Sequence, residues 1–278
     1  MGQQPVALVT GASSGIGQAT AKLLATNGFI VFGTSRTPDG QSTRPYTMLS
    51  LDVRLDASVN AAVQAVHSQV GRIDLLVNNA GYGQAGAIEE NSVADAQAQF
   101  ETNLFGVMRM TNAVVPLMRR QGGGRIINIS SVLGQLAFPY VGLYAASKFA
   151  LEGFTEALRE ELRPFAIHVS LIEPGFVKTS FAGQPPQQWI EDYAAVRQAA
   201  LQFTRAGIAS GIQPDMVAQA ILVAARAPHP RLRYRVGRTA HVLSALKHLL
   251  PDRALERVRR QIVPIDTAGT RKHQSQIS

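Results

Sequence analysis

The chain of 278 residues contains no cysteine, which excludes disulfides, thiolate metal sites and a cysteine nucleophile. It also has no run of about eighteen apolar residues, the length that a membrane-spanning helix needs. The stretch MGQQPVALVT at the start lacks the basic segment and the longer apolar core of a secretory signal peptide. These absences predict a cytoplasmic protein in a reducing compartment.

Most of the chain has no excess of basic over acidic side chains, although the net charge is +8. Residues 1–225 hold 15 basic and 16 acidic side chains, whereas residues 226–278 hold 12 Lys and Arg against three acids. A basic end of this kind could meet anionic lipid or nucleic acid. Arginine-rich surface used for packing and solubility is the commoner explanation, so no nucleic-acid partner is expected.

Short apolar runs rich in Val and Ile alternate with longer stretches of helical pattern. Nearly continuous apolar runs are typical of strands that are covered on both faces. We expect strands at 6–10, 29–34, 46–51, 73–78, 125–130, 167–172 and 231–236, and helices at about 15–27, 56–71, 92–120 and 144–163. The alternation predicts an α/β fold of the Rossmann-like, doubly wound kind, with a mostly parallel seven-stranded sheet and helices on both faces.

The stretch from Pro174 to Pro214 interrupts this alternation with Gly, Pro and Gln punctuation and scattered aromatic residues. A long excursion after a strand is where an open α/β sheet places a substrate cover, and a purely structural insertion is the alternative. After the seventh strand, two short helices are expected on either side of Pro251, with Asp252 as the N-cap of the second. The predicted divisions are a catalytic domain at 1–237, a helical extension at 238–264 and a disordered tail at 265–278.

The first apolar run leads directly into TGASSGIG at residues 10–17, and a helical pattern follows. Gly11, Gly15 and Gly17 allow a tight turn, close approach of backbone to phosphate, and close packing of helix on strand. The helix start offers unpaired N–H groups to a pyrophosphate. The turn therefore predicts a dinucleotide site that also includes Ser13, Ser14 and Ile16.

The end of the second strand bears on which dinucleotide fits. NAD-specific sites usually place an acid about twenty residues beyond the glycines, to take the ribose 2′-hydroxyl. Here Ser35 stands at that place with Arg36 beside it, and no carboxylate repels a phosphate. An arginine can grip a 2′-phosphate, and Ser13, Ser14 or Ser35 could add hydroxyl donors. The sequence therefore favours NADP(H) over NAD(H).

A phenol and an ammonium stand four residues apart in YAASK, from Tyr144 to Lys148. Alone, this spacing is also typical of a solvated helix face. Together with other motifs it resembles the short-chain dehydrogenase/reductase family of the single-domain kind, from about residue 5 to residue 237. The motifs that carry the resemblance are TGASSGIG at 10–17, NNAG at 78–81, INISS at 127–131, YAASK at 144–148 and PG at 174–175.

The resemblance implies a catalytic tetrad of Asn103, Ser131, Tyr144 and Lys148. Ser131 lies thirteen residues before Tyr144, which is the family's interval, and Asn103 lies in ETNLFG, which matches the family's helical asparagine motif. The same likeness implies further cofactor contacts, with Tyr144 and Lys148 also among them. These are Asp52 and Val53 at the adenine, Asn79, Ala80 and Gly81 at the ribose, and Pro174, Gly175, Val177 and Thr179 at the nicotinamide end.

Each member of this tetrad has a chemical reason. Hydride transfer to a carbonyl leaves charge on oxygen, so the site needs an acid in reduction and the corresponding base in oxidation. A free tyrosine, with a pKa of about 10, is too weak a base at neutral pH, and a nearby ammonium would lower that pKa. Ser131 can donate to the substrate oxygen. By resemblance, Asn103 anchors a water in a proton relay that ends at Lys148.

The sequence thus predicts an NADP(H)-dependent oxidoreductase that interconverts an alcohol and a ketone or aldehyde, with Tyr144 as acid and base. Apolar residues of 174–203, together with Phe138, Pro139 and Tyr140, indicate a hydrophobic small-molecule substrate. The segments GTSR and LLPD resemble the branch that contains 17β-hydroxysteroid and retinol dehydrogenases. Steroid-like, retinoid-like and acyl-like substrates all remain open.

Functions of two other classes are alternatives to this one. A dinucleotide-sensing protein without turnover would be expected to lose Tyr144 or Lys148, and neither is lost. Leu255, Val258 and Ile262 form an apolar stripe beside an Arg-rich face, the pattern of a helix that docks on a membrane or a partner. Packing against the domain or a second subunit explains this stripe equally well.

The chain offers no pattern of metal ligands, because its histidines are scattered without metal-ligand spacing. No metal is therefore expected. By resemblance to the family, the helices that carry Asn103 and Tyr144 are expected to form a homodimer or homotetramer.

Overall fold

The computed structural model describes residues 3–38, 43–181 and 183–262, and its centre is one parallel sheet. Seven strands lie in the order β3-β2-β1-β4-β5-β6-β7, and every neighbouring pair is parallel. This confirms the predicted fold class. The strands are β1 Val6–Val9, β2 Ile30–Ser35, β3 Thr47–Ser50, β4 Leu75–Asn78, β5 Gly124–Ile129, β6 Ile167–Pro174 and β7 Arg233–Val236.

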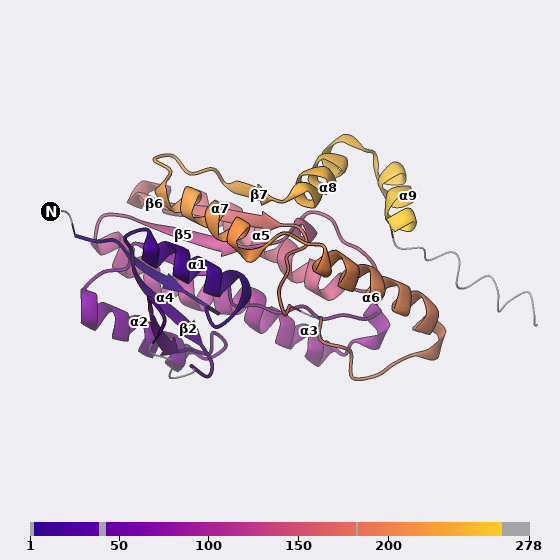
Figure 1. Cartoon of the computed structure of the whole chain (residues 1–278), viewed down its shortest axis with the longest axis horizontal. Helices are drawn as coiled ribbons and strands as arrows, with labels where there is room; N and C mark the ends of the chain where they lie inside the picture. Colours follow the sequence, from indigo (N-terminus) through magenta and orange to yellow (C-terminus); the bar gives the residue numbers. More distant parts are fainter. Residues whose placement is uncertain (1–2, 39–42, 182, 263–278) are drawn as a thin grey trace, which may run out of the picture.

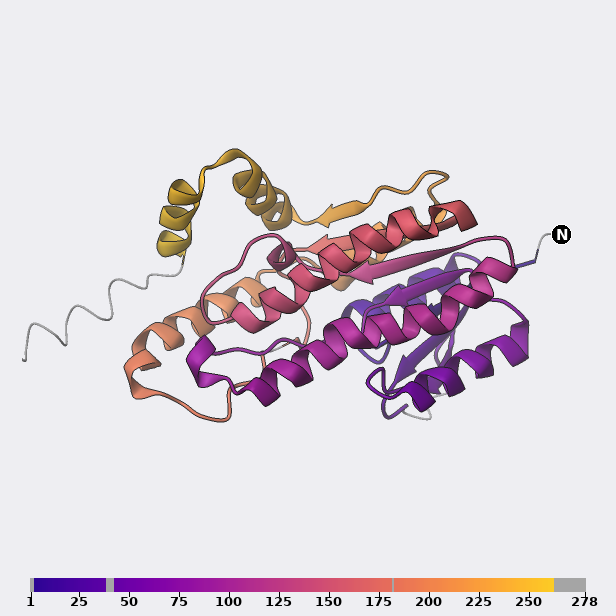
Figure 2. The same cartoon turned by 180° about the vertical axis from the view of Figure 1, so that it is seen from behind.

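Helices cover both faces of the sheet (Figures 1 and 2). In Figure 1, α1 and α7 lie in front of the sheet, and Figure 2 shows α4 and α5 on the opposite face. The helices are α1 Gly15–Thr26, α2 Asp56–Val70, α3 Val93–Phe100, α4 Gly106–Arg120, α5 Gly142–Leu162, α6 Ala194–Ala209, α7 Pro214–Arg226, α8 Arg238–Leu249 and α9 Asp252–Ile262.

Each face of the sheet has its own apolar core. On one face, side chains of α2, α4 and α5 such as Val59, Met110 and Leu158 pack on the strands. On the other face, α1 and α7 contribute Leu24 and Ile221. Strands β1 and β4 are buried along their whole length, because their Val and Leu side chains face a core on both sides.

Three features differ from the sequence prediction. The helix expected at 92–120 is interrupted by a π-helical segment, Glu101–Phe105, between α3 and α4. Within 174–214 the chain forms α6, which is rich in alanine but buries only Val196 and Ala200, so its apolar periodicity is weak. Helix α7 was also absent from the expected helices.

The second C-terminal helix begins one residue earlier than the predicted cap implies. Pro251 takes the cap position, since its carbonyl oxygen accepts hydrogen bonds from the backbone N–H groups of Ala254 and Leu255 at 2.9 and 3.1 Å. Asp252 is therefore the first residue of α9 rather than its N-cap. The predicted tail at 265–278 and the last two residues of the extension lie outside the described residues.

Helix α9 turns its apolar stripe towards the domain. Leu255 is 1% exposed, and Ile262 packs against a small cluster that includes Ala87, Tyr140 and Val196. This packing accounts for the stripe that the sequence also allowed as a membrane-facing or partner-facing surface. Of the helices in the described ranges, none combines the length and apolarity required to traverse a bilayer.

Candidate active site

The residues singled out by their motifs gather at one edge of the sheet. The glycine turn follows β1, Ser35 ends β2, Asn79 follows β4 and Ser131 follows β5. Because all strands are parallel, their carboxyl ends meet at this edge, which is where open α/β sheets bind ligands. In Figure 1 the N-terminus lies at the opposite end of the molecule from α6 and α9.

The turn between β1 and α1 has the conformation that its glycines permit. Gly11 and Gly15 adopt left-handed backbone angles, with φ of +66° and +54°. Ser14 is the N-cap residue of α1, but its hydroxyl makes no capping hydrogen bond. The start of α1 therefore has backbone donors and a free hydroxyl available to an anionic group.

Asn79, from the loop after β4, fixes this turn. Its side-chain Nδ2 donates to the carbonyl oxygens of Thr10 and Gly11 at 2.9 and 3.0 Å. In return, Thr10 Oγ1 accepts from the backbone N–H groups of Asn79 and Ala80, both at 2.9 Å. These bonds join the glycine turn to the segment Asn79–Gly81. The two segments, both predicted to contact the cofactor, therefore form one rigid unit.

The ends of β2 and β3 carry the residues predicted to meet the adenosine end of a dinucleotide. Ser35 Oγ is buried and has no hydrogen-bond partner among the described residues, while Arg36 is exposed. A hydrogen bond from Arg54 holds the pKa of Asp52 below its usual value, and Arg36 acts in the same direction. The side chain of Val53 belongs to the core and packs towards Gly106 of α4.

Tyr144 and Lys148 lie one turn apart on α5, with Ser131 beside them. Lys148 Nζ is 5.7 Å from the centre of the Tyr144 ring and donates to the carbonyl oxygen of Ile129 at 2.7 Å. Ser131 caps a short 3-10 turn, Val132–Gly134, by accepting from the Leu133 N–H at 3.1 Å. The structure therefore brings a phenol, an ammonium and a hydroxyl together.

Burial changes the acidity of both titratable groups. Burial raises the pKa of Tyr144 to about 12, while a hydrogen bond with Ser131 acts in the opposite direction. Burial lowers the pKa of Lys148 to about 8, and the negative charge of Glu152 acts against this shift. Neighbouring groups with strongly shifted pKa values are typical of active sites, because catalysis needs pKa values matched to each group's task.

Asn103 lies in the π-helical segment and ties three elements together. Its Oδ1 accepts from the Tyr82 N–H at 3.1 Å, and its Nδ2 donates to the Tyr82 carbonyl at 2.9 Å. The same Nδ2 lies 3.0 Å from Ser147 Oγ, which donates to the Tyr144 carbonyl at 2.7 Å. A π-helical turn often marks a functional site, because it leaves the helical hydrogen-bond ladder locally open.

The segment after β6 returns over the glycine turn. Gly175 N–H donates to the Val236 carbonyl, and Val177 forms an isolated bridge with Ile212. Thr179 Cγ2 lies 3.2 Å from the point where a Cβ on Gly15 would stand. Of the predicted nicotinamide-end residues, Thr179 therefore lies directly against the glycine turn.

Phe181 covers the phenol of Tyr144. The two ring centroids are 5.5 Å apart with an interplanar angle of 58°, and Phe181 remains 39% exposed. Phe181 also packs towards Gly83, where an added Cβ would stand 3.1 Å from its ring. The side of the Tyr144 ring that faces Phe181 is thus apolar.

A buried ion pair fixes the segment 174–214 to the body of the domain. Arg197 of α6 pairs with Glu90, whose side chain is 0% exposed. The Glu90 carboxylate also accepts the N–H groups of Ala87 and Ile190 at 2.9 and 3.0 Å. Trp189 stacks on this arginine, whose guanidinium carbon lies 4.2 Å from the ring centre.

Removing the charge at this pair is expected to destabilise the fold. Glu90→Gln leaves the Arg197 guanidinium buried without its counter-ion, which should lower the free energy of unfolding by about 3 kcal/mol in urea titrations. Glu89→Gln is the matched control, because Glu89 accepts only an exposed hydrogen bond from Tyr193. Equal losses in the two variants would show that the buried pair has no special role.

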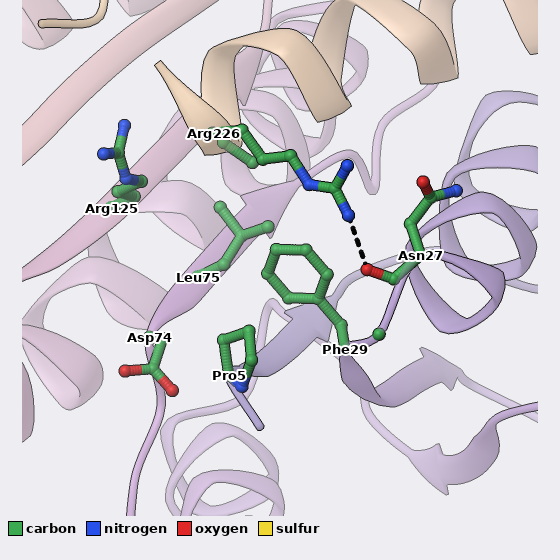
Figure 3. Close-up of a pocket in the computed structure, with 9 residues that line it drawn as sticks. Pro5, Asn27, Phe29, Asp74, Leu75, Arg125 and Arg226 are labelled. Carbon is green, nitrogen blue, oxygen red and sulfur yellow. Dashed lines mark hydrogen bonds between the residues drawn. The ribbon is translucent and has the colours of Figure 1, made fainter. Parts of the chain in front are cut away.

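The structure also has a cavity of ≈ 370 Å³, but it lies at the amino-terminal edge of the sheet (Figure 3). Phe29, Leu75 and Pro5 form its apolar wall, and Arg226 donates to the Asn27 carbonyl at 2.6 Å. Because ligands of parallel α/β sheets bind at the carboxyl edge, this cavity is separate from the candidate site.

Some residues of the site had no motif that would have revealed them. Ser147 lies inside the YAASK segment, and it bonds to both Asn103 and the turn that carries Tyr144. Glu90, Arg197 and Glu152 make their contacts with sequence-distant partners, and no local pattern signals those contacts. In the portion of the chain that the structure describes, no group of three His, Asp or Glu could hold a metal ion.

Comparison with known proteins identifies the family of the chain. The sequence profile described as short chain dehydrogenase matches residues 5–190. The chain is 40% identical over 259 residues to 3-ketodihydrosphingosine reductase of Bacteroides thetaiotaomicron, covering 91% of this chain and 96% of that protein. It is 41% identical over 217 residues to the monensin polyketide synthase putative ketoacyl reductase of Streptomyces virginiae, covering 74% and 83%.

Solved structures of related proteins share the fold. A short-chain dehydrogenase from Streptomyces avermitilis superimposes with a TM-score of 0.79 at 33% identity, covering 94% of this chain and 96% of that one. A Burkholderia phymatum relative in complex with NAD gives 0.75 at 28% identity, with coverages of 89% and 92%. One from Burkholderia cenocepacia with NADP gives 0.74 at 25%, with coverages of 92% and 97%. This chain is therefore an oxidoreductase of the short-chain dehydrogenase/reductase family.

Proposed function

We propose that the chain is an NADP(H)-dependent oxidoreductase that interconverts a hydrophobic ketone and the corresponding alcohol. The observation that carries this proposal is that Tyr144 lies beside Ser131 and Lys148, with the apolar ring of Phe181 packed on Tyr144. A bound nicotinamide dinucleotide supplies or accepts the hydride. The chain's own residues supply the proton, the orientation of the carbonyl and the exclusion of water.

Tyr144 is proposed as the proton donor in reduction. Because burial holds its pKa at about 12, the phenol is protonated throughout the neutral range and can deliver a proton to the developing alkoxide. Ser131 Oγ is placed to donate to the same substrate oxygen and stabilise its charge. In oxidation the phenol must lose its proton, and the Lys148 ammonium favours the phenolate.

The residues of the glycine turn fit a dinucleotide. The free Ser14 hydroxyl and the N–H groups at the start of α1 suit a pyrophosphate. The exposed Arg36 and the buried Ser35 Oγ suit a ribose 2′-phosphate, because this oxygen has no hydrogen-bond partner in the part of the chain that the structure describes. Asp52 is already paired to Arg54. These features support NADP(H) as the preferred cofactor.

An apolar substrate is supported by the groups around the site. Phe181 lies on Tyr144, and beyond it Tyr140 and Tyr193 pack edge to face, with ring centroids 6.4 Å apart. Ile262 and Phe138 pack against the same cluster. Two relatives are named for keto substrates, which favours a ketone over an aldehyde.

The function is tested by NADPH oxidation with a homologous series of ketones of increasing alkyl length. We expect kcat/KM to rise by up to roughly fourfold per methylene until the apolar region is filled, because each buried CH2 contributes about 0.8 kcal/mol. A flat response would reject a hydrophobic substrate, and a lack of NADPH oxidation across the whole series would reject ketone reduction.

Cofactor preference gives a separate prediction. Arg36→Ala is expected to weaken NADPH binding by about ten- to a hundredfold and to leave NADH binding nearly unchanged, because a hydrogen bond to a charged group is worth about 1.5–3 kcal/mol. Fluorescence titration of each reduced dinucleotide measures both. Arg54→Ala is the control arginine, because its guanidinium is held by Asp52 at 2.6 Å. Equal weakening of NADPH and NADH by Arg36→Ala would contradict a 2′-phosphate contact.

A further inference from the structure

A cluster of buried carboxylates begins one helical turn beyond Lys148. Glu152 follows Lys148 by four residues on α5, so the two side chains share one face of the helix. Lys148 is 7% exposed, Glu152 is 5% exposed, and Glu173, near the end of β6, is 1% exposed. Acids are almost never buried to this extent unless they are paired, so the cluster needs an explanation.

Arginine partners neutralise this cluster from the strand β7. Arg233 Nε donates to Glu152 Oε2 and also lies 2.9 Å from Glu173 Oε1. Arg235 Nε lies 3.3 Å from Glu173 Oε2, and Gln135 donates to Glu173 Oε1 at 2.7 Å. Both carboxylate oxygens of Glu173 therefore have a partner, whereas Glu152 has one arginine partner, Arg233, and shares it with Glu173.

One oxygen of Glu152 is left over. Glu152 Oε1 and Ser130 Oγ are both buried, and neither has a hydrogen-bond partner of good geometry within the described ranges. Both atoms surround Gly134, where an added Cβ would stand 3.2 and 2.8 Å from them. Half of the carboxylate thus faces the protein interior without a cation bonded to it.

We propose that Glu152 is a positioning residue for the reaction: its carboxylate, buried one turn beyond Lys148 and only partly neutralised by Arg233, keeps Lys148 in the ammonium form. The inference rests on the proposed function, in which that ammonium favours the Tyr144 phenolate. Glu152 touches neither the phenol nor the reacting atoms in this arrangement and acts through Lys148.

The acidities of the cluster agree with this role. Burial pulls the pKa of Lys148 down to about 8, and Glu152 opposes that shift. Burial raises the pKa of Glu152, and interaction with the Ser130 hydroxyl acts against that shift; of the charged neighbours, Glu173 raises this pKa and Arg233 lowers it. The charged and titratable groups that face this region are Tyr144, Glu152 and Glu156 on α5, Glu173 on β6, and Arg233 and Arg235 on β7.

The test is a direct titration of Lys148 by NMR in protein labelled with ¹³C at the lysine ε-carbon. The chain has only four other lysines, at 22, 178, 247 and 272, so the signal can be assigned by comparison with Lys148→Met. Glu152→Gln is expected to move the Lys148 titration to a pH below about 8. Glu156→Gln is the matched control, because Glu156 bonds the same Arg233 but has a half-exposed side chain.

Activity supplies a second measurement. Ketone reduction needs both the phenol and the ammonium protonated, so the rate falls at alkaline pH as the first proton leaves the pair. Glu152→Gln should move this decline towards acid pH, with about a tenfold loss of kcat/KM at pH 8 that is recovered at lower pH. Glu152→Asp keeps the charge and should retain the Lys148 pKa.

An unchanged Lys148 pKa in Glu152→Gln, or an equal fall in Glu156→Gln, would overturn the inference. Should Glu152→Gln fail to fold, the wild-type protein still decides. Its Lys148 signal should carry a second, smaller inflection at the pH where Glu152 ionises, and a single inflection would reject the coupling. Because the titration needs no turnover, a shifted Lys148 pKa without ketone reduction would reject the proposed function alone.

Discussion

Tyr144→Phe is expected to lower kcat for ketone reduction by about a thousandfold and to leave dinucleotide binding nearly unchanged. The substitution removes only the hydroxyl, and a well-placed proton donor contributes about 10²- to 10⁴-fold to the rate. The remaining ring still packs on Phe181, whose centroid is 5.5 Å away, so the apolar wall of the site is kept.

The pH behaviour of the wild-type enzyme follows from the same group. With a pKa of about 12, Tyr144 is protonated below that pH, so loss of its own proton does not limit reduction in the neutral range. Steady-state rates and fluorescence titration of NADPH separate the proton step from binding. Tyr234→Phe is the control, because Tyr234 lies on β7 and its hydroxyl accepts from the backbone N–H of Arg231. A Tyr144→Phe variant as active as this control would remove the phenol from the mechanism.

The fold and the gathering of the site could be predicted because both depend on local pattern. Buried runs rich in Val and Leu, such as β1 and β4, predict a parallel sheet. A parallel sheet brings the carboxyl ends of its strands to one edge. Motifs that directly follow the strands, such as the glycine turn and Ser131, must then lie near one another. Family resemblance added the identity of the motifs.

The features that the sequence did not predict depend on contacts between residues far apart in the chain. Glu90 and Arg197 are 107 residues apart, and Arg233 meets Glu152 across 81 residues. Each residue alone has the pattern of a solvated charge, since burial depends on what the chain brings against it. Helix α6 was not predicted for a related reason. It lies in the segment 174–214 and has few buried side chains. Hydrophobic periodicity, the main signal for a helix, is therefore weak there.

Within the glycine turn, Gly17 is expected to be the position that tolerates an added side chain least. A Cβ at Gly17 would stand 2.2 Å from the Gly11 carbonyl oxygen and 2.5 Å from Asn79 Nδ2. Neither neighbour can withdraw freely, because the Gly11 carbonyl accepts from Asn79 and the same amide also bonds Thr10. An added methyl must therefore push α1 away from the loop after β4 and open the turn.

Gly17→Ala should accordingly weaken NADPH binding at least about a hundredfold and lower the free energy of unfolding by about 1–3 kcal/mol, the usual cost of overpacking. Gly153→Ala is the contrasting variant, since Gly153 lies inside α5 and nothing stands within 4 Å of its added Cβ. There the same methyl should stabilise the helix by roughly 0.5–1 kcal/mol. Urea unfolding and fluorescence titration of both variants measure these effects, and similar behaviour of the two would show that the close approach at Gly17 is not what the dinucleotide turn requires.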